Sequence, residues 1–174
     1  MYRTMGYQQV EVPWIVAEQI LHLTSPITTP HLLVKPEGQT KIGGLIGSGE
    51  QGLLAIREQL KIGKWMTLTP CFRVEPKYDN LYKQQFIKIE LMEVLDPKEG
   101  QKDWFLKGMI SNAVRVMSTW ERDVKLVETK DGFDLQVNEI EVGSYGLRQW
   151  GDFHWIYGTG LAEPRFSVAV GVLK

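Results

Sequence analysis

Two stretches near the middle of the chain alternate apolar and charged residues with the period of a β-strand. In residues 65–75, Phe72 and Val74 are separated by charged neighbours, and in residues 86–95 the same alternation starts at Ile87. A period of two places successive side chains on opposite faces of a sheet. The pattern therefore predicts two strands joined by a polar loop, with one apolar face and one charged face.

Further strands and helices are expected on both sides of this pair. The clearest helical periodicity covers residues 102–123, where apolar residues recur every three or four positions. Shorter helices are expected at residues 14–23, from about Gln51 after a Ser48 cap to a stop at Gly63, and after Pro164. Other strands are expected at residues 6–12, 31–35, 124–127 and 133–137, from residue 139, and at the glycine-containing segment before Pro164, with a loop at 149–154 and a mobile segment at 36–44.

This order of elements predicts an α+β fold. Strands and helices are interspersed without a regular β-α-β rhythm, which favours a mostly antiparallel sheet of six to seven strands flanked by helices. Residues 158–165 do not form a GxGxxG motif, and no GKS or GKT sequence is present, so neither a dinucleotide fingerprint nor a P-loop is supported. A chain of 174 residues has the usual size of one domain, which we expect to span residues 1–174.

Composition bears on the compartment of the protein and on the partners it binds. Twenty basic and 21 acidic residues give a net charge of −1, so no overall basic field indicates nucleic acid or an anionic membrane. The N-terminus lacks the apolar core of a secretion signal, and no later run approaches the length of a membrane span. We therefore expect a cytoplasmic protein without membrane contact. The single cysteine, Cys71, is expected to be a core residue, and it makes no zinc spacing with the three histidines.

The charged face of the two central strands has two interpretations. It carries Arg73, Glu75 and Glu90 together with an aromatic residue, Phe86. An ordinary half-buried hairpin has such a solvated face. The same residues also suit a nucleotide, because arginine binds phosphate, an aromatic ring stacks on a base and carboxylates hold a metal or an ammonium group.

Four stretches in order resemble the catalytic core of class II aminoacyl-tRNA synthetases. Residues 6–13 (GYQQVEVP) resemble the strand and proline that end the family's first motif. The other three are FRVE at 72–75 followed by Phe86 and Glu90, EVGSYGLR at 141–148, and GTGLAEPRF at 158–166. The loop DNLYKQQF is also similar to a pattern of the phenylalanyl and phosphoseryl branch, while aspartyl enzymes have a comparable spacing from glutamate to arginine.

The resemblance implies a site for ATP and Mg²⁺. Arg73 would hold the α-phosphate and the substrate carboxylate, Phe86 would stack under adenine, and Arg165 would cover its other face and reach the γ-phosphate. Glu75 would contact the adenine or its neighbourhood. Glu141 would hold magnesium between the phosphates. Such a site works by positioning and by stabilising negative charge, so it needs no protein nucleophile.

A second magnesium ligand is expected at Glu139, which the strand pattern places on the same face as Glu141. For the amino acid, Ser48–Gln51 is similar to the family segment that receives the α-ammonium group, with Glu50 the first candidate and Gln51 the second. Glu50 alternatively is an acid in a first helical turn, favoured by the helix dipole. Arg148 would bind an acidic side chain or the carboxylate of the substrate through two hydrogen bonds, or else it is a surface arginine. The glycines near Glu141 and Arg165 are either turn residues or part of this site.

Three departures from the family bear on function. Tyr82 stands where the family usually has a histidine or arginine directed at the γ-phosphate. The sequence starts at the first-motif strand and ends after the third motif, so we expect neither the long helix that helps to build the family's homodimer nor an anticodon-binding domain. The expected absence of that domain weakens the expectation of tRNA charging. The expected absence of the helix weakens the expectation of a homodimer.

The leading hypothesis is a ligase that activates an amino acid or related carboxylate with ATP as an aminoacyl adenylate. Candidate acceptors of the activated group are RNA, tRNA among them, a protein or a small amine. One alternative is an inactive paralogue that binds a nucleotide or amino acid and regulates a partner. Another is an RNA-binding module, against which the neutral net charge counts.

Overall fold

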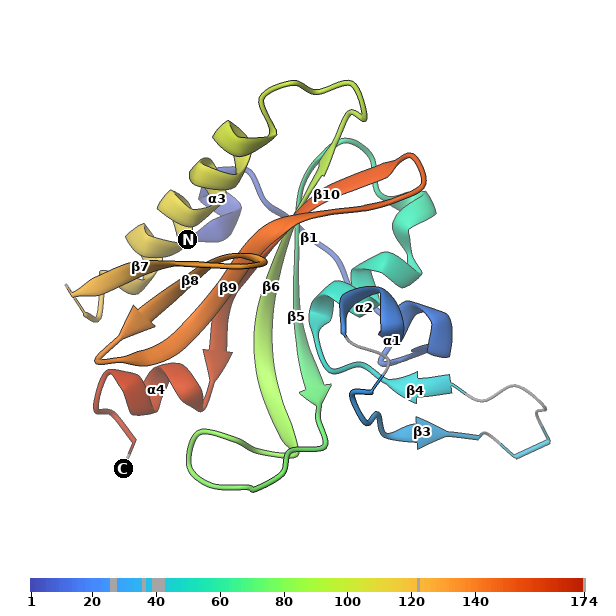
Figure 1. Cartoon of the computed structure of the whole chain (residues 1–174), viewed down its shortest axis with the longest axis horizontal. Coiled ribbons are helices and arrows are strands. Elements are labelled where there is room, and N and C mark those ends of the chain that lie inside the picture. Colours follow the sequence, from blue (N-terminus) through green and yellow to red (C-terminus); the bar gives the residue numbers. More distant parts are fainter. Residues whose placement is uncertain (26–27, 36, 39–42, 122, 174) are drawn as a thin grey trace.

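One strongly twisted sheet runs through the centre of the molecule (Figure 1). The computed structural model describes residues 1–25, 28–35, 37–38, 43–121 and 123–173. Within them the large sheet has the strand order β1 (Gln8–Gln9), β5 (Gly63–Phe72), β6 (Gln85–Leu95), β10 (Phe153–Glu163), β9 (Ile140–Trp150), β8 (Gly132–Val137) and β7 (Val124–Thr129). Its neighbours pair antiparallel except for the parallel pair β1 and β5. The predicted α+β fold with a mostly antiparallel sheet is confirmed.

The central strands β5 and β6 form the predicted antiparallel hairpin. Their pairing runs from Gly63 opposite Val94 to Phe72 opposite Gln85. One further bond, from the Arg73 amide to the Gln84 carbonyl at 2.9 Å, closes the ladder. Arg73 and Glu75 therefore lie in the loop beyond β5, which corrects the prediction that the strand continues to residue 75.

Helix α3 (Lys102–Met117) covers one face of the sheet (Figure 1). Its apolar stripe, Leu106, Met109, Ile110, Ala113, Val116 and Met117, is buried. It packs on Leu91 and Leu95 of β6 and on buried residues of β8, β9 and β10. The helix ends six residues before the predicted end at 123, because residues 118–120 turn away and bring the Trp120 ring to 5.8 Å from the Phe166 ring of α4 (Arg165–Ala169).

The opposite face of the sheet is only partly covered. Helix α2 (Gly49–Ala55), which the Ser48 side chain caps as predicted, packs Leu53 and Leu54 against Met92 and Val94 of β6. Phe86, Lys88 and Glu90 lie on the same face of β6, because alternate residues share a face. Helix α2 leaves Phe86 and Lys88 uncovered, and these two residues form part of the wall of a pocket.

The N-terminal segments build a small second sheet that the sequence pattern did not predict. Its order is β2 (Ile15–Ala17), β4 (Gly43–Leu45) and β3 (Leu33–Val34). Residues 14–23 are thus not one helix. The β-branched Ile15 and Val16 extend and pair with β4, and helix α1 (Glu18–Thr24) follows. Most of the segment expected to be mobile, residues 36 and 39–42, lies outside the described residues.

Three other boundaries differ from the prediction. Helix α2 ends at Ala55 and gives way to a 3-10 turn, η2 (Arg57–Gln59), while Gly63 starts β5. A second 3-10 turn, η1 (Tyr2–Met5), precedes β1, which covers only two residues of the predicted strand at 6–12. Strands β9 and β10 continue through the predicted loop at 149–154 and need only a tight turn, in which Gly151 has φ +59°.

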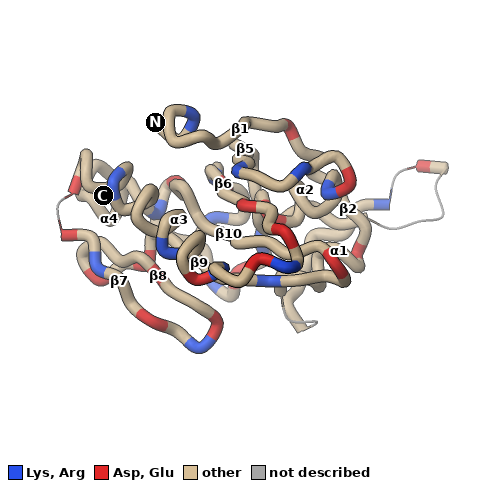
Figure 2. The backbone as a smooth tube through the Cα atoms, turned by 90° about the horizontal axis from the view of Figure 1, so that it is seen from above, with Lys and Arg blue, Asp and Glu red and all other residues tan. Residues whose placement is uncertain are grey.

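Charges of both signs are interspersed along the described chain (Figure 2), as the net charge of −1 leads one to expect. No helix among the described residues is long and apolar enough to cross a membrane.

Close packing across β10 gives a test of the fold. A Cβ atom added at Gly158 would lie against the Tyr145 ring and 2.7 Å from Met109 Sδ. We therefore expect Gly158→Ala to lower the free energy of unfolding by about 1–3 kcal/mol, the usual effect of overpacking a core. Urea unfolding measures it.

The matched control is Gly108→Ala in α3, where an added Cβ meets no atom within 4 Å. This variant should raise the free energy of unfolding by up to about 1 kcal/mol, because alanine favours a helix. Equal effects of the two substitutions would contradict the packing described here.

Candidate functional site

A pocket opens on the uncovered half of the sheet face. Its walls come from the loop between β5 and β6, the lower part of β6, the start of β9, the end of β10 and the start of α4. The predicted nucleotide-site residues that line it are Arg73, Glu75, Phe86, Glu141 and Arg165. The structure thus brings together five residues spread over more than ninety positions of the sequence.

Arg73 and Phe86 form one side of this pocket. The Arg73 guanidinium lies 5.2 Å from the centre of the Phe86 ring, and its Nε donates to the Gly47 carbonyl at 2.8 Å. This bond fixes the arm of the arginine and leaves its terminal nitrogens for a ligand. Arg73 and Glu75 also line a second pocket, which lies beside α1 and α2.

Arg165 and Glu141 form the other side. Arg165 Nη1 lies 3.2 Å from Glu141 Oε1, and the arginine side chain is 19% exposed and the glutamate 47%. The Tyr82 ring lies 5.1 Å from the Arg165 guanidinium. The position that departs from the family pattern therefore contacts the arginine expected to bind ATP.

A local turn holds Tyr82 in place. The amides of Leu81 and Tyr82 donate to Asp79 Oδ1 at 2.8 and 2.9 Å. These bonds favour the charged carboxylate and lower the pKa of Asp79. The loop from Arg73 to Gln84 thus has internal order around the residue that touches Arg165.

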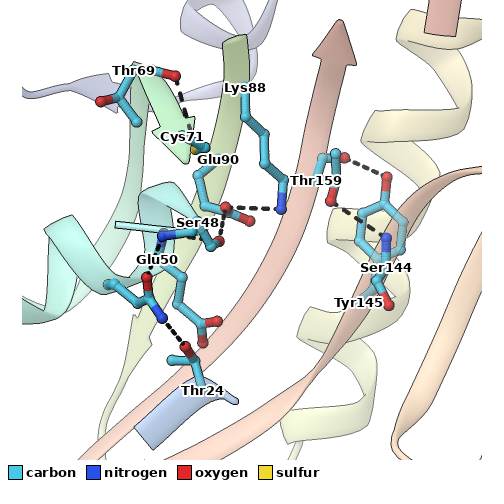
Figure 3. A network of polar contacts seen from close by, with 12 residues as sticks. Thr24, Ser48, Glu50, Thr69, Cys71, Lys88, Glu90, Ser144, Tyr145 and Thr159 are labelled. Atoms are coloured by element: carbon cyan, nitrogen blue, oxygen red, sulfur yellow. Dashed lines mark hydrogen bonds and ion pairs between the residues drawn. The ribbon is translucent and has the colours of Figure 1, made fainter. Parts of the chain in front are cut away.

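A buried ion pair of Lys88 and Glu90 lies beside the pocket (Figure 3). Glu90 is 1% exposed, and its Oε2 atom lies 2.9 Å from Lys88 Nζ and also accepts a hydrogen bond from the Ser48 hydroxyl. Lys88 lines the pocket. Sequence reasoning missed Lys88 as a site residue, although its place between Phe86 and Glu90 at a spacing of two puts all three on one face.

Sequence reasoning also missed two hydroxyl-bearing residues of the pocket wall. Ser144 and Thr159 line the pocket, and the Ser144 amide lies 3.4 Å from Thr159 Oγ1 (Figure 3). The Ser144 hydroxyl donates to Asp134 Oδ1 at 2.6 Å. Ser144 belongs to the EVGSYGLR stretch, so its position three residues after Glu141 was the available signal.

The predicted amino-acid residues Glu50 and Arg148 bind each other. Arg148 Nη1 lies 2.5 Å from Glu50 Oε2, and the Trp155 indole donates to Glu50 Oε1 at 2.7 Å. The guanidinium lies 4.0 Å from the centre of the Tyr157 ring. Burial raises the pKa of Glu50, although Arg148 opposes this change, and Glu50 in turn raises the pKa of Arg148 against the effect of burial. Glu50 lines neither of the two pockets at Arg73.

Gln51 lines the second pocket, but its amide group already has partners. Its Oε1 accepts from the Gly47 amide at 2.7 Å, and its Nε2 donates to Thr24 Oγ1 at 2.9 Å and to the Leu21 carbonyl at 3.2 Å. These bonds tie α2 to α1. Gln51 therefore supports the wall of the second pocket from within.

Glu139 lies apart from Glu141. It occupies the turn between β8 and β9 with Asn138, and both residues have positive φ, 64° and 48°. Glu139 is exposed and is not part of the pocket wall. The predicted strand face shared by the two glutamates is wrong, because β9 starts only at Ile140.

Cys71 is a core residue, as predicted. It is fully buried, and burial raises the pKa of its thiol to about 12, so the reactive thiolate is disfavoured. Among the described residues no group of three or more His, Cys, Asp or Glu side chains is placed to hold a metal ion.

Solved structures that share this fold include several class II aminoacyl-tRNA synthetases. The chain matches seryl-tRNA synthetase from Pyrococcus horikoshii, complexed with ATP, with a TM-score of 0.71 and 18% identity over 97% of this chain and 46% of that one. It matches cytoplasmic serine-tRNA ligase from Naegleria fowleri, in complex with AMP, with a TM-score of 0.71 and 16% identity over 99% of this chain and 50% of that one.

PylSc from Desulfitobacterium hafniense, a pyrrolysyl-tRNA synthetase, matches with a TM-score of 0.73 and 18% identity over 98% of this chain and 65% of that one. The chain thus spans about half the length of the two seryl enzymes. No protein-family model matches the chain, and no curated protein matches it in sequence. At these identities the likeness is one of fold, and it confirms the predicted synthetase-like core.

The buried pair of Glu50 and Arg148 gives a stability prediction. Arg148→Met should lower the free energy of unfolding by about 3–5 kcal/mol, because it leaves a buried carboxylate without its cation. Glu50→Gln should cost less, since Arg148 is 27% exposed and reaches water. The double variant should cost less than the sum of the two, as urea unfolding will measure.

Lys125→Met is the matched control. Its partner Asp123 is 3.7 Å away, and the two side chains are 58% and 70% exposed, so the change should be below about 1 kcal/mol. Additive effects of Glu50→Gln and Arg148→Met would show that the two residues do not act as a pair.

Proposed function

We propose that this chain uses ATP to activate an amino acid or a related carboxylate as an acyl adenylate. The observation that carries the proposal is the pairing of two arginines across one pocket. Arg73 lies over Phe86 on one side, and Arg165 lies beside Glu141 on the other. The fold supports it, because two neighbours with this fold were solved with ATP or AMP.

In this reaction a carboxylate oxygen attacks the α-phosphorus of ATP and pyrophosphate leaves. Arg73 would bind the α-phosphate and the attacking carboxylate, holding both in line. Phe86 would stack under the adenine, with Glu75 beside it. Arg165 would stack on the other face of the base and neutralise charge on the γ-phosphate. A protein nucleophile is not required, which agrees with the unreactive Cys71.

The site suits Mg²⁺ held mainly by ATP. Mg²⁺ prefers oxygen ligands and commonly takes one or two carboxylates together with substrate phosphates and water. Glu141 is 47% exposed at the pocket, and the Ser144 oxygen lies in the same wall. Glu141 would hold the ion with Ser144 nearby, while Glu139, in its exposed turn, is left out. When bound, Mg²⁺ supplies positive charge that neutralises the phosphates.

The destination of the acyl group is also part of the proposal. Transfer to tRNA is one option by analogy with the structural neighbours, and transfer to a protein or small amine is the other. We further propose a cytoplasmic ligase that works in protein biosynthesis or a related process.

A second candidate function is a nucleotide-binding protein that does not activate a carboxylate. The contact of the Tyr82 ring with Arg165 at 5.1 Å favours it. A tyrosine carries no positive charge toward the γ-phosphate, and its ring occupies one side of the arginine expected to bind there. Such a protein would act as a regulatory or RNA- or protein-binding module.

Arg73→Ala should weaken ATP binding at least tenfold. Hydrogen bonds to charged groups contribute about 1.5–3 kcal/mol, and 1.4 kcal/mol is tenfold in affinity. Calorimetric titration with ATP and Mg²⁺ measures the change. Arg115→Ala is the control, because Arg115 is exposed in the last turn of α3 on the covered side of the sheet. Equal affinity of the Arg73→Ala variant and the unmodified protein would contradict the assigned nucleotide site.

Exchange of radioactive pyrophosphate into ATP should depend on an added carboxylic acid and should be lost in Arg73→Ala. A panel of the amino acids and related carboxylates is tested with the whole chain. ATP binding without exchange for any acid would reject activation and support the second candidate. Exchange that persists in Arg73→Ala would leave activation standing but remove Arg73 from it.

A further inference from the structure

Almost all carboxylates that line the pocket or lie near it already have ion-pair or hydrogen-bond partners within the protein. Glu141 pairs with Arg165, and Glu163 accepts hydrogen bonds from the Ser167 amide and hydroxyl at 3.1 and 2.8 Å. Glu90 pairs with Lys88, and Glu50 pairs with Arg148. This distribution of charge constrains the kind of acid that the site accepts.

Glu50 has a partner at each of its two carboxylate oxygens. It is 3% exposed, and its two oxygens face Arg148 Nη1 at 2.5 Å and the Trp155 indole at 2.7 Å. Arg148 is held in turn against the Tyr157 ring at 4.0 Å and near the Thr24 carbonyl at 3.5 Å. A substrate ammonium group brought to Glu50 would have to displace a guanidinium that Tyr157 and Thr24 also hold in place.

Glu90 is equally unavailable. The Lys88 ammonium already lies 2.9 Å from it, and the Ser48 hydroxyl donates to the same oxygen (Figure 3). A second ammonium group here would meet the positive charge of Lys88 at short range, where like charges repel strongly because little water screens them. Lys88 thus takes the place beside Glu90 that a substrate ammonium group would need.

Glu75 is the lining carboxylate that remains. It is partly exposed, lies in the loop beyond β5, and borders both pockets at Arg73. A partly exposed carboxylate binds an ammonium group weakly, because water screens the pair. In the proposed function Glu75 is also the group that contacts adenine.

We infer that the acid activated at this site carries no free ammonium group next to its carboxylate. The inference rests on the proposed function and names its substrate class: 2-hydroxy acids, N-acylated amino acids or simple carboxylic acids. Arg148 and Lys88 supply from within the protein the positive charges that an amino acid would otherwise bring. Arg73 remains available for the carboxylate itself.

Matched pairs of acids test the inference on the unmodified chain. Each pair joins an amino acid with its 2-hydroxy and N-acetyl analogues, for example alanine with lactate and N-acetylalanine, and the readout is pyrophosphate exchange at equal concentration. The best acid without an ammonium group should exchange at least tenfold faster than its amino-acid partner. An amino acid that exchanges within tenfold of its partners, or faster, overturns the inference.

The exchange assay distinguishes failure of this inference from failure of the proposed function. Exchange with free amino acids alone overturns the inference and leaves acid activation standing. Exchange with no acid of any class overturns the proposed function and, with it, the inference.

Two variants connect the preference to Arg148. Arg148→Met frees Glu50 and should lower the ratio of ammonium-free to amino-acid exchange at least tenfold. The control Arg57→Met removes an arginine that lies 4.1 Å from the Trp150 ring and pairs with the exposed Glu58 instead of Glu50, so it should keep the ratio. An unchanged ratio in a folded Arg148→Met protein overturns the role of Arg148. If that variant does not fold, the inference is tested by the ratio of exchange rates measured on the unmodified chain.

Discussion

The need to neutralise charge inside the protein determines how this molecule is assembled. Glu50 and Glu90 are both almost inaccessible to water, and an unpaired carboxylate in such a place carries a large energetic penalty. Their partners come from other elements or from the neighbouring position on the same strand face: Arg148 from β9 and Lys88 from β6. The pair of Glu50 and Arg148 joins α2 to the sheet across 98 positions of sequence.

Glu90 lies between two different environments on one face of β6. Toward the end of the strand, Met92 and Val94 pack under α2. Toward its start, Phe86 and Lys88 face the pocket. Glu90 lies at the transition, where a strand that must serve both the core and a polar site changes from apolar to charged side chains. The side chains that face the pocket therefore continue, along one face of β6, into those that pack under α2.

The sequence was informative wherever short-range chemistry decides the structure. Alternation predicted β5 and β6, the Ser48 cap predicted the start of α2, and motif order predicted that Arg73, Phe86, Glu141 and Arg165 would meet. Contacts between distant segments were not predictable in the same way. The partner of Arg148 depends on how α2 packs on the sheet. The strand β2 depends on a pairing with β4 that overrides a helical pattern, and the left-handed backbone of Glu139 leaves no periodic signal.

Arg73 has a place in both pockets, with its arm tied to the Gly47 carbonyl and its terminal nitrogens unbound by that contact. Among the described residues, Arg73 and Glu75 are the two that line both spaces. A ligand that drew the guanidinium toward one pocket would change the affinity of the other pocket by some factor, and a second ligand would then change the affinity of the first by the same factor. Ligands in the two pockets would be coupled through this shared wall.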